Sequence, residues 1–365
     1  MLGRALIVLT TWMSIALSAQ SPATTPAAPA SPARSTAPVA HDADDPAIWI
    51  DSTRPERSLI LGTDKTAKRG ALYVFGLDGA VKQVIAPLDR PNNVDVEYGF
   101  ALDGRSIDIA VVTERKARRL RVFAIPNDGG PLVDLALDGI PVLTGQQGEA
   151  GEPMGIALFR RPADGAVFAL VAPKSGGATN YLSQYRLADN GRGGIAGTLV
   201  RRFGAFSDRR MLLRRIGEIE GVVVDDELGY VYYSDERFGI RKYHADPDHP
   251  QASQELAVFG RAGYEGEREG LAIYRTGPAT GYLVSSDQVR GGTRVFLYRR
   301  EGEPGRPHDH PRVAIVPTRS DATDGLEAIA TPLPGFPRGM LVMMTSGTRA
   351  FLMYDWDRIA AHLPR

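Results

Sequence analysis

Residues 42–75 read DADDPAIWIDSTRPERSLILGTDKTAKRGALYVF and contain three short apolar runs with different flanking residues. The first run, within 42–50, follows a group of acidic residues. The second, LILGTDK at 59–65, ends in a polar tip, and the third, YVF at 73–75, carries two aromatic side chains. Short runs of Ile, Leu, Val and aromatic residues separated by Gly, Asp and Pro are typical of β-strands. The stretch therefore predicts three consecutive strands, the first entered from an acidic head.

The same three-part unit occurs six times along the chain. The aromatic residues of its third strand are roughly 55 residues apart, a period typical of a propeller blade. They are Phe75, Phe123, Tyr185, Tyr243, Tyr298 and Tyr354. The polar tips end the runs at 59–65, 109–115, 168–174, 231–237, 282–288 and 341–347. This repetition favours an all-β, six-bladed β-propeller over a sandwich or jelly roll, and we expect one propeller domain at 41–362.

The composition excludes several classes of protein. The chain has 365 residues, with 43 Lys and Arg against 43 Asp and Glu, so its net charge is zero. A zero net charge gives no long-range attraction to nucleic acid or to an anionic membrane. The absence of Cys excludes thiol catalysis, disulfides and thiolate zinc sites. A chain of this size can bury a core without a partner subunit, so we expect a monomer that does not bind nucleic acid.

The amino terminus predicts export. Residues 1–19, MLGRALIVLTTWMSIALSA, place Arg4 before an apolar run that ends in small residues, which is the pattern of a signal peptide. Residues 20–40 are almost entirely Ser, Pro, Ala and Thr, which predicts a disordered linker. We expect a secreted or periplasmic protein that is free of the membrane after cleavage. A strand contributed by the region before Asp42 is one way to complete the last blade.

The corresponding loops of all blades converge around one axis in a propeller. The six heads and six tips therefore gather many charged side chains. The acids at these positions are Asp44, Asp45, Asp95, Glu152, Glu220, Asp235, Glu236, Glu267, Glu269, Asp324 and Glu327, and the cations are Lys65, Arg115 and Lys174. Carboxylates at this density repel one another unless some are protonated or hard cations lie among them. Oxygen ligands without Cys favour Ca²⁺ over zinc or copper.

Cations at matching tip positions suit an anion with several oxygens, such as phosphate. Carboxylates that hold a metal beside basic anchors are what phosphoryl hydrolysis needs. The metal lowers the pKa of a bound water, and the basic groups offset charge on the phosphate oxygens. The charged residues alone thus favour a metal-dependent phosphate-ester hydrolase.

Several motifs resemble those of a known family. They are DADDPAIW at 42–49, NNVDVEY at 92–98, IEG at 219–221, EGLAIY at 269–274, GYLVSSDQ at 281–288 and ATDGLE at 322–327. In this order, and over about 41–358 of the chain, they resemble the β-propeller phytases. The resemblance implies a calcium-dependent enzyme that removes phosphate from myo-inositol hexakisphosphate (phytate) or its calcium salt. It also implies a cleavage site beside a second phosphate-affinity site, and direct attack of metal-bound water on phosphorus.

The resemblance further implies roles for individual residues. Lys65, Arg115 and Lys174 would bind phosphate oxygens. Several calcium ions would be held by Asp44, Glu220, Asp235, Glu267, Glu269 and Asp324. Four of these acids would also form the catalytic set that activates the attacking water: Glu220, Asp235, Glu267 and Glu269.

Three positions depart from the family pattern. Glu97 stands where Arg is common, and Met154 stands where a phosphate-binding Tyr is expected. Thr345-Ser346-Gly347 replaces a QDG-like tip. Loss of the Arg and the Tyr would weaken polyphosphate binding, and a Glu beside the anion pocket would repel the substrate. The reaction class is therefore better determined than the substrate.

Two other functions remain open at the level of sequence. A propeller lactonase or other esterase also uses an axial Ca²⁺, but it needs a hydrophobic acyl pocket more than a set of cations. A non-catalytic propeller would bind a polyanion or another protein. Phosphate release from phytate separates the leading hypothesis from both alternatives.

Overall fold

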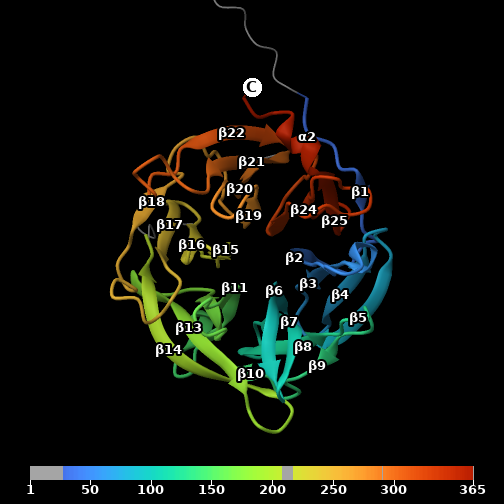
Figure 1. Ribbon diagram of the computed structural model, residues 1–365, viewed down its shortest axis with the longest axis vertical. Coiled ribbons are helices and arrows are strands. Elements are labelled where there is room, and N and C mark those ends of the chain that lie inside the picture. The colour runs from blue at the N-terminus through green and yellow to red at the C-terminus, as the bar shows by residue number, and fades with distance from the viewer. Residues whose placement is uncertain (1–27, 208–216, 290, 365) are drawn as a thin grey trace, which may run out of the picture.

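Six β-sheets are arranged as blades around one axis in the computed structural model, which describes residues 28–207, 217–289 and 291–364 (Figure 1). Paired strands within each described sheet are antiparallel. The first strands of neighbouring blades contact one another and surround the axis. The predicted all-β, six-bladed propeller is confirmed.

The blades follow the order of the chain. Blade 1 contains β2 (Ala43–Trp49), β3 (Leu59–Asp64), β4 (Gly70–Gly76) and β5 (Val81–Leu88). Blade 2 contains β6 (Pro91–Leu102), β7 (Arg105–Glu114), β8 (Arg119–Ile125), β9 (Val133–Asp134) and β10 (Ile140–Pro141). Blade 3 contains β11 (Pro153–Arg160), β12 (Val167–Pro173), β13 (Thr179–Asp189) and β14 (Ile195–Ala205).

Blade 4 contains β15 (Val222–Asp225), β16 (Tyr230–Asp235), β17 (Gly239–His244) and β18 (Ala257–Phe259). Blade 5 contains β19 (Leu271–Arg275), β20 (Gly281–Val289), β21 (Gly292–Arg299) and β22 (Arg312–Pro317). Blade 6 contains β23 (Leu326–Ile329), β24 (Met340–Thr345), β25 (Ala350–Asp355) and β1 (Arg34–Ser35). The short helices are η1 (Pro55–Arg57), η2 (Gly148–Gly151) and α2 (Trp356–Ala360). No helix in the described ranges is long and apolar enough to cross a membrane.

The recurring aromatic residue occupies the same place in every blade. Each one lies on the third strand and is buried. Hydrophobic clusters fill the spaces between neighbouring blades. One of them joins Trp49 and Val74 of blade 1 to Phe123 of blade 2. Because complete burial of a large apolar side chain stabilises the fold by about 1.5–3 kcal/mol, these clusters hold the blades in fixed positions around the axis.

The last blade is completed from the other end of the chain. β1 pairs with β25, Arg34 opposite Met353, and the Thr36 N–H donates to the Phe351 carbonyl at 3.0 Å. The predicted closing strand is therefore confirmed. The predicted disordered linker at 20–40 is wrong for 28–40, because backbone hydrogen bonds to β25 order this segment. The predicted signal peptide at 1–19 and residues 20–27 lie outside the described part of the chain.

The strand order explains why heads and tips share one end of the molecule. The first and second strands of a blade are antiparallel, so the start of the first lies beside the end of the second, as Ala43 lies opposite Asp64 in blade 1. The head before the first strand and the tip after the second therefore meet at the same end of the axis. This geometry repeats in all six blades and determines where the charged residues gather.

Candidate functional site

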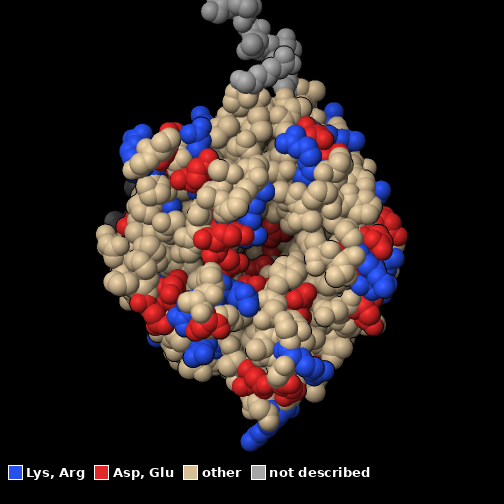
Figure 2. All heavy atoms as spheres, viewed as in Figure 1, with Lys and Arg blue, Asp and Glu red and all other residues tan. Residues whose placement is uncertain are grey.

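A cavity of about 270 Å³ lies at the end of the axis where the heads and tips meet. We call it the central cavity. Figure 2 views the molecule from the other end of the axis, where a hollow also lies at the centre of the ring with acidic and basic side chains around it. All six blades contribute to the lining of the central cavity, which consists of Lys65, Arg90, Asn92, Arg115, Met154, Lys174, Glu218, Glu220, Glu236, Glu267, Glu269, Gln288 and Asp324.

The three predicted phosphate-binding cations all line this cavity, and each one is paired with a carboxylate. Lys65 Nζ lies 2.7 Å from Asp44 Oδ1 and also pairs with Asp324. Arg115 Nε donates to Glu152 Oε2 at 3.0 Å. The ammonium group of Lys174 pairs with Glu218. The three basic groups are thus each positioned by an acid on a nearby loop.

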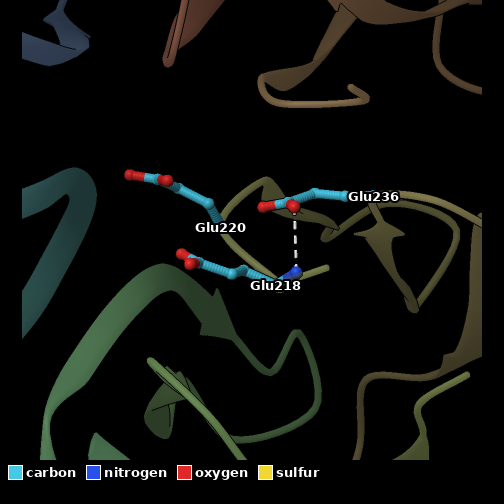
Figure 3. Close-up of side chains that lie close together, drawn as sticks. All are labelled: Glu218, Glu220 and Glu236. Atoms are coloured by element: carbon cyan, nitrogen blue, oxygen red, sulfur yellow. Dashed lines mark hydrogen bonds between the residues drawn. The ribbon is translucent and has the colours of Figure 1, made fainter. Parts of the chain in front are cut away.

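Three glutamates of blade 4 form a compact acidic cluster. Oxygen atoms of Glu218, Glu220 and Glu236 lie within 4.8 Å of one another, and the side chains extend to the same side (Figure 3). The Glu218 N–H donates to Glu236 Oε2 at 2.9 Å. Glu220 Oε1 accepts a hydrogen bond of 2.6 Å from Asn92 Nδ2 of blade 2. These contacts hold three carboxylates close together despite their repulsion.

Burial and mutual repulsion raise the pKa of several of these carboxyl groups. Burial is the largest cause at Glu220 and at Glu269, and the pKa of each lies well above its ordinary range. Neighbouring negative charge adds to the shift, chiefly from Asp44 at Glu220 and from Glu236 at Glu269. Burial, followed by the charge of Glu218, raises the pKa of Glu236 to about 8. A divalent cation among these groups would favour their charged forms.

Asp44 supplies a further sign that the acids suit a cation. It is fully buried, and apart from Lys65 its carboxylate has no hydrogen-bonding partner in the described chain. Burial raises the pKa of Asp44 to about 7, although Lys65 lowers it. A buried carboxylate oxygen without a donor is unfavourable in water-free surroundings. Hard cations such as Ca²⁺ take six to eight oxygen ligands of this kind, so the donor set fits calcium.

Comparison with known proteins agrees with this geometry. The sequence model of the phytase family matches residues 2–363. The chain belongs to the phytase family. Over 336 residues it is 31% identical to the 3-phytase of Bacillus subtilis (strain 168), covering 88% of this chain and 81% of that protein. The chain is thus a phosphomonoester hydrolase of the 3-phytase type, as the motif resemblance predicted.

A solved structure supports the fold alone. A protein from Lactobacillus plantarum superposes with a TM-score of 0.51 at 15% sequence identity, over 87% of this chain and 82% of the other. At this identity the likeness concerns the propeller and not the chemistry of the site.

One predicted site residue of this phytase family member lies elsewhere. Asp235 is buried, but it does not line the central cavity: its carboxylate accepts hydrogen bonds from Arg241 Nε at 3.0 Å and from the Ser207 N–H at 2.9 Å. The prediction that Asp235 holds calcium and activates water is not supported. The next residue, Glu236, lines the cavity instead, because consecutive side chains of an extended chain point in opposite directions.

Glu97 also lies away from the predicted place. It lines a chamber of about 670 Å³, which we call the opposite chamber, together with Asp95, Asp226 and Glu327. β6 starts at the central cavity near Asn92 and leads along the axis, and five residues of strand span roughly 16 Å. The expectation that Glu97 repels substrate in the anion pocket is therefore wrong.

The other two departures are close to the site. Met154 lines the central cavity and is buried. The tip at Thr345–Gly347 is bound to Asp321, whose carboxylate accepts hydrogen bonds from the Thr345 hydroxyl at 2.5 Å and from the Gly347 N–H at 2.7 Å. Asp321 lines a groove of about 680 Å³ that shares Glu267 and Gln288 with the central cavity. The cavity thus opens into a groove over blades 5 and 6.

Sequence reasoning missed several lining residues. Glu218 and Arg90 lie just before the motifs IEG and NNVDVEY, and Gln288 ends the tip of blade 5. Position relative to the repeat is the signal that could have identified them, since each lies at a head or at a tip.

Proposed function

We propose that this protein is a calcium-dependent phytase that releases phosphate from myo-inositol hexakisphosphate. The observation that carries the proposal is the meeting of cations and carboxylates from all six blades in one cavity. Family membership supports phosphomonoester hydrolysis. The groove beside Glu267 and Gln288 offers room for the part of a large polyphosphate that does not react.

The cations would bind the phosphate that is cleaved. The three cations lie at the tips of blades 1, 2 and 3, and all of them line the central cavity: Lys65, Arg115 and Lys174. Their present partners are carboxylates, which phosphate oxygens would replace or join. Fixed cations next to the equatorial oxygens stabilise the charge of the transition state without reorganisation.

The carboxylates would hold calcium. We assign Glu220, Glu267, Glu269 and Asp324, which line the cavity, and Asp44, which pairs with the cavity residue Lys65, to this role. Glu218 and Glu236 would be additional ligands, and several ions would be held in total. Calcium, when bound, supplies positive charge beside the phosphate and lowers the pKa of water. Glu220, Glu267 and Glu269 would orient the attacking water and accept its proton. The buried, unpartnered carboxylate of Asp44 and the clustered glutamates are the features that support this assignment.

A phosphate-release assay tests the proposal. Phytate is incubated with the purified protein in calcium, in excess chelator, and in chelator followed by added calcium. We expect release only in the first and third conditions. Release that persists in excess chelator would contradict the calcium mechanism. Binding of phytate by calorimetry without release over hours would favour the non-catalytic alternative, and hydrolysis of a lactone but not of phytate would favour the lactonase alternative.

We also propose that the protein is exported as a monomer. The pattern at 1–19 supports a signal peptide that is removed near Ala19. The propeller domain would then begin at β1 (Arg34–Ser35), which pairs with β25, and not at residue 41. Amino-terminal sequencing of the protein recovered from the periplasm and from the medium, together with its mass in solution, tests cleavage, location and oligomeric state.

A further inference from the structure

The opposite chamber is a second hollow on the axis, at the far end from the central cavity. Its volume is about 670 Å³. The first strands of the blades begin at the central cavity, and the chamber is lined where they end: Trp49 ends β2, Arg275 ends β19 and Ile329 ends β23. Figure 2 looks onto this end and shows acidic side chains around the central hollow. No described residue lines both hollows, so the chamber is separate from the phosphate site.

Much of the wall of the opposite chamber is apolar. Blades 1, 2, 3 and 5 contribute Ile48, Val96, Leu158 and Ile273 to it. Sites that bind small organic molecules usually enclose about 300–1,000 Å³ and combine apolar walls with a few polar groups. The size and the lining of the chamber therefore suit an organic molecule.

The polar part of the wall is mainly negative. Four of its carboxylates have no ion-pair partner in the described ranges: Asp95, Glu97, Asp226 and Glu327. Arg275 is the one basic residue among the described lining residues, and its Nε atom lies 3.0 Å from Glu227 Oε2. Because negative charge exceeds positive charge, the chamber suits a positively charged ligand.

Glu97 lacks a partner for one of its oxygen atoms. Its side chain is buried, with the residue 6% exposed, and its Oε1 atom accepts one hydrogen bond of 2.8 Å from the Tyr98 N–H. Oε2 has no donor in the described chain, which is unfavourable for a buried carboxylate. Burial, followed by the charge of Asp95, likewise raises the pKa of Glu327 to about 8. An ammonium group in the chamber would supply donors and would favour the charged forms of both glutamates.

The spacing of the acids distinguishes an organic cation from a metal ion. Among the described residues, only Glu218, Glu220 and Glu236 of the central cavity bring three acidic or imidazole side chains within 4.8 Å of one another. The acids of the opposite chamber therefore do not surround a single point, as the ligands of a calcium ion must. Separated carboxylates with apolar surface between them suit positive charges that are joined by a hydrocarbon chain.

We propose that the opposite chamber binds an aliphatic diamine or polyamine. Its ammonium groups pair with Glu97 and the other three carboxylates, and its methylene groups contact the apolar wall. Charge-assisted hydrogen bonds of this kind are stronger than neutral ones. The site is independent of phosphate hydrolysis and adds a ligand to the protein beyond the proposed function.

Calorimetric titration with spermidine tests the proposal. Spermidine is titrated in calcium-containing buffer into wild type, Glu97→Gln and Asp78→Asn. E97Q keeps the shape of the side chain and removes its charge. D78N is the matched control, because Asp78 is 62% exposed and lies outside the chamber. We expect E97Q to raise Kd roughly 10- to 100-fold and D78N to match wild type.

A monoamine provides the second measurement. Butylamine has one ammonium group and pairs with one carboxylate at a time, so wild type should bind it at least about 10-fold more weakly than spermidine. Equal Kd values for the two amines would contradict binding by separated carboxylates.

The remaining outcomes overturn the proposal. Wild type that does not bind spermidine at millimolar concentration has no such site, and equal Kd values for wild type and E97Q place the amine elsewhere. If E97Q loses a calcium-binding event while wild type binds no spermidine, the chamber is a metal site. Glu327→Gln provides the comparison if E97Q does not fold. Phosphate release plays no part in these measurements, so failure of the proposed function leaves the test unaffected.

Discussion

Lys174 offers the most direct test of the cation set at the scale of a single residue. The side chains of Lys174 and Glu218 are each 20% exposed, so replacing Lys174 leaves Glu218 without this partner and should lower the unfolding free energy by about 1–3 kcal/mol. Lys174→Met removes a fixed charge from the phosphate, and we expect kcat/KM for phytate to fall by about 10²- to 10³-fold. Lys82→Met is the control, because that side chain is 54% exposed on an outer strand. Equal rates for both variants would contradict the assignment.

Glu97 gives a prediction about pH. Burial, followed by the charge of Asp226, raises its pKa to about 8. The folded protein therefore keeps a proton on Glu97 that the unfolded chain releases near the ordinary glutamate pKa. As pH rises between these two values, the unfolding free energy falls, and the full loss is reached above pH 8. Glu97→Gln should raise Tm by about 1–3 °C at pH 9 and leave it unchanged at pH 4. Thermal unfolding at both pH values checks this, and equal shifts would contradict it.

Side-chain direction is the part of the site that could not be read from sequence. The repeat identified which loops converge, and it placed Lys65, Lys174 and Glu269 correctly. It could not decide between Asp235 and Glu236, because adjacent residues point in opposite directions and the choice depends on where β16 ends. Glu97 was misplaced for a related reason: residues close in sequence along a strand can lie at opposite ends of the axis.

At the scale of elements, β1 is the strand whose removal tests the architecture. Without residues 28–40, β25 loses the hydrogen bonds from the Ala33 and Thr36 N–H groups and becomes an exposed edge. Each hydrogen bond contributes about 0.5–1.5 kcal/mol net to the unfolding free energy. An unpaired edge strand can form hydrogen bonds with a strand of another molecule, which leads to association. We expect a chain beginning at residue 41 to show a lower Tm and to form larger species.

A chain beginning at residue 28 is the reference for that truncation. Thermal unfolding and size-exclusion chromatography compare the two. Identical Tm and identical elution would show that β1 does not contribute to ring closure.

The strands themselves were largely predictable from sequence. The recurring aromatic residues lie on the third strand of each blade because a buried position on that strand faces the neighbouring blade. The composition of 28–40 predicted disorder, since Pro, Ala, Ser and Thr carry no hydrophobic pattern, and only the need to complete the last blade pointed to a strand before Asp42. Its order comes from backbone pairing with β25, which composition does not report.

For the whole molecule, calcium should link activity to stability. The acids that line the central cavity come from blades 4, 5 and 6, so an ion among them joins distant parts of the chain. A ligand that binds only the folded state stabilises it by about 2.7 kcal/mol at 100 times its Kd. We expect chelation to lower Tm as well as to abolish phosphate release, and added calcium to restore both. A calorimetric scan in which chelator leaves Tm unchanged would contradict structural binding of calcium by these groups.

The pairing of β1 with β25 has a consequence for biosynthesis. The last residue that lines the central cavity is Asp324, yet β25 extends to Asp355. A ribosome that has translated every cavity residue has therefore not yet made the strand that closes the ring. A premature stop codon between these two positions would give a polypeptide that contains every residue lining the central cavity. Its last blade would lack β25, so β1 would have no strand to pair with and the ring could not close.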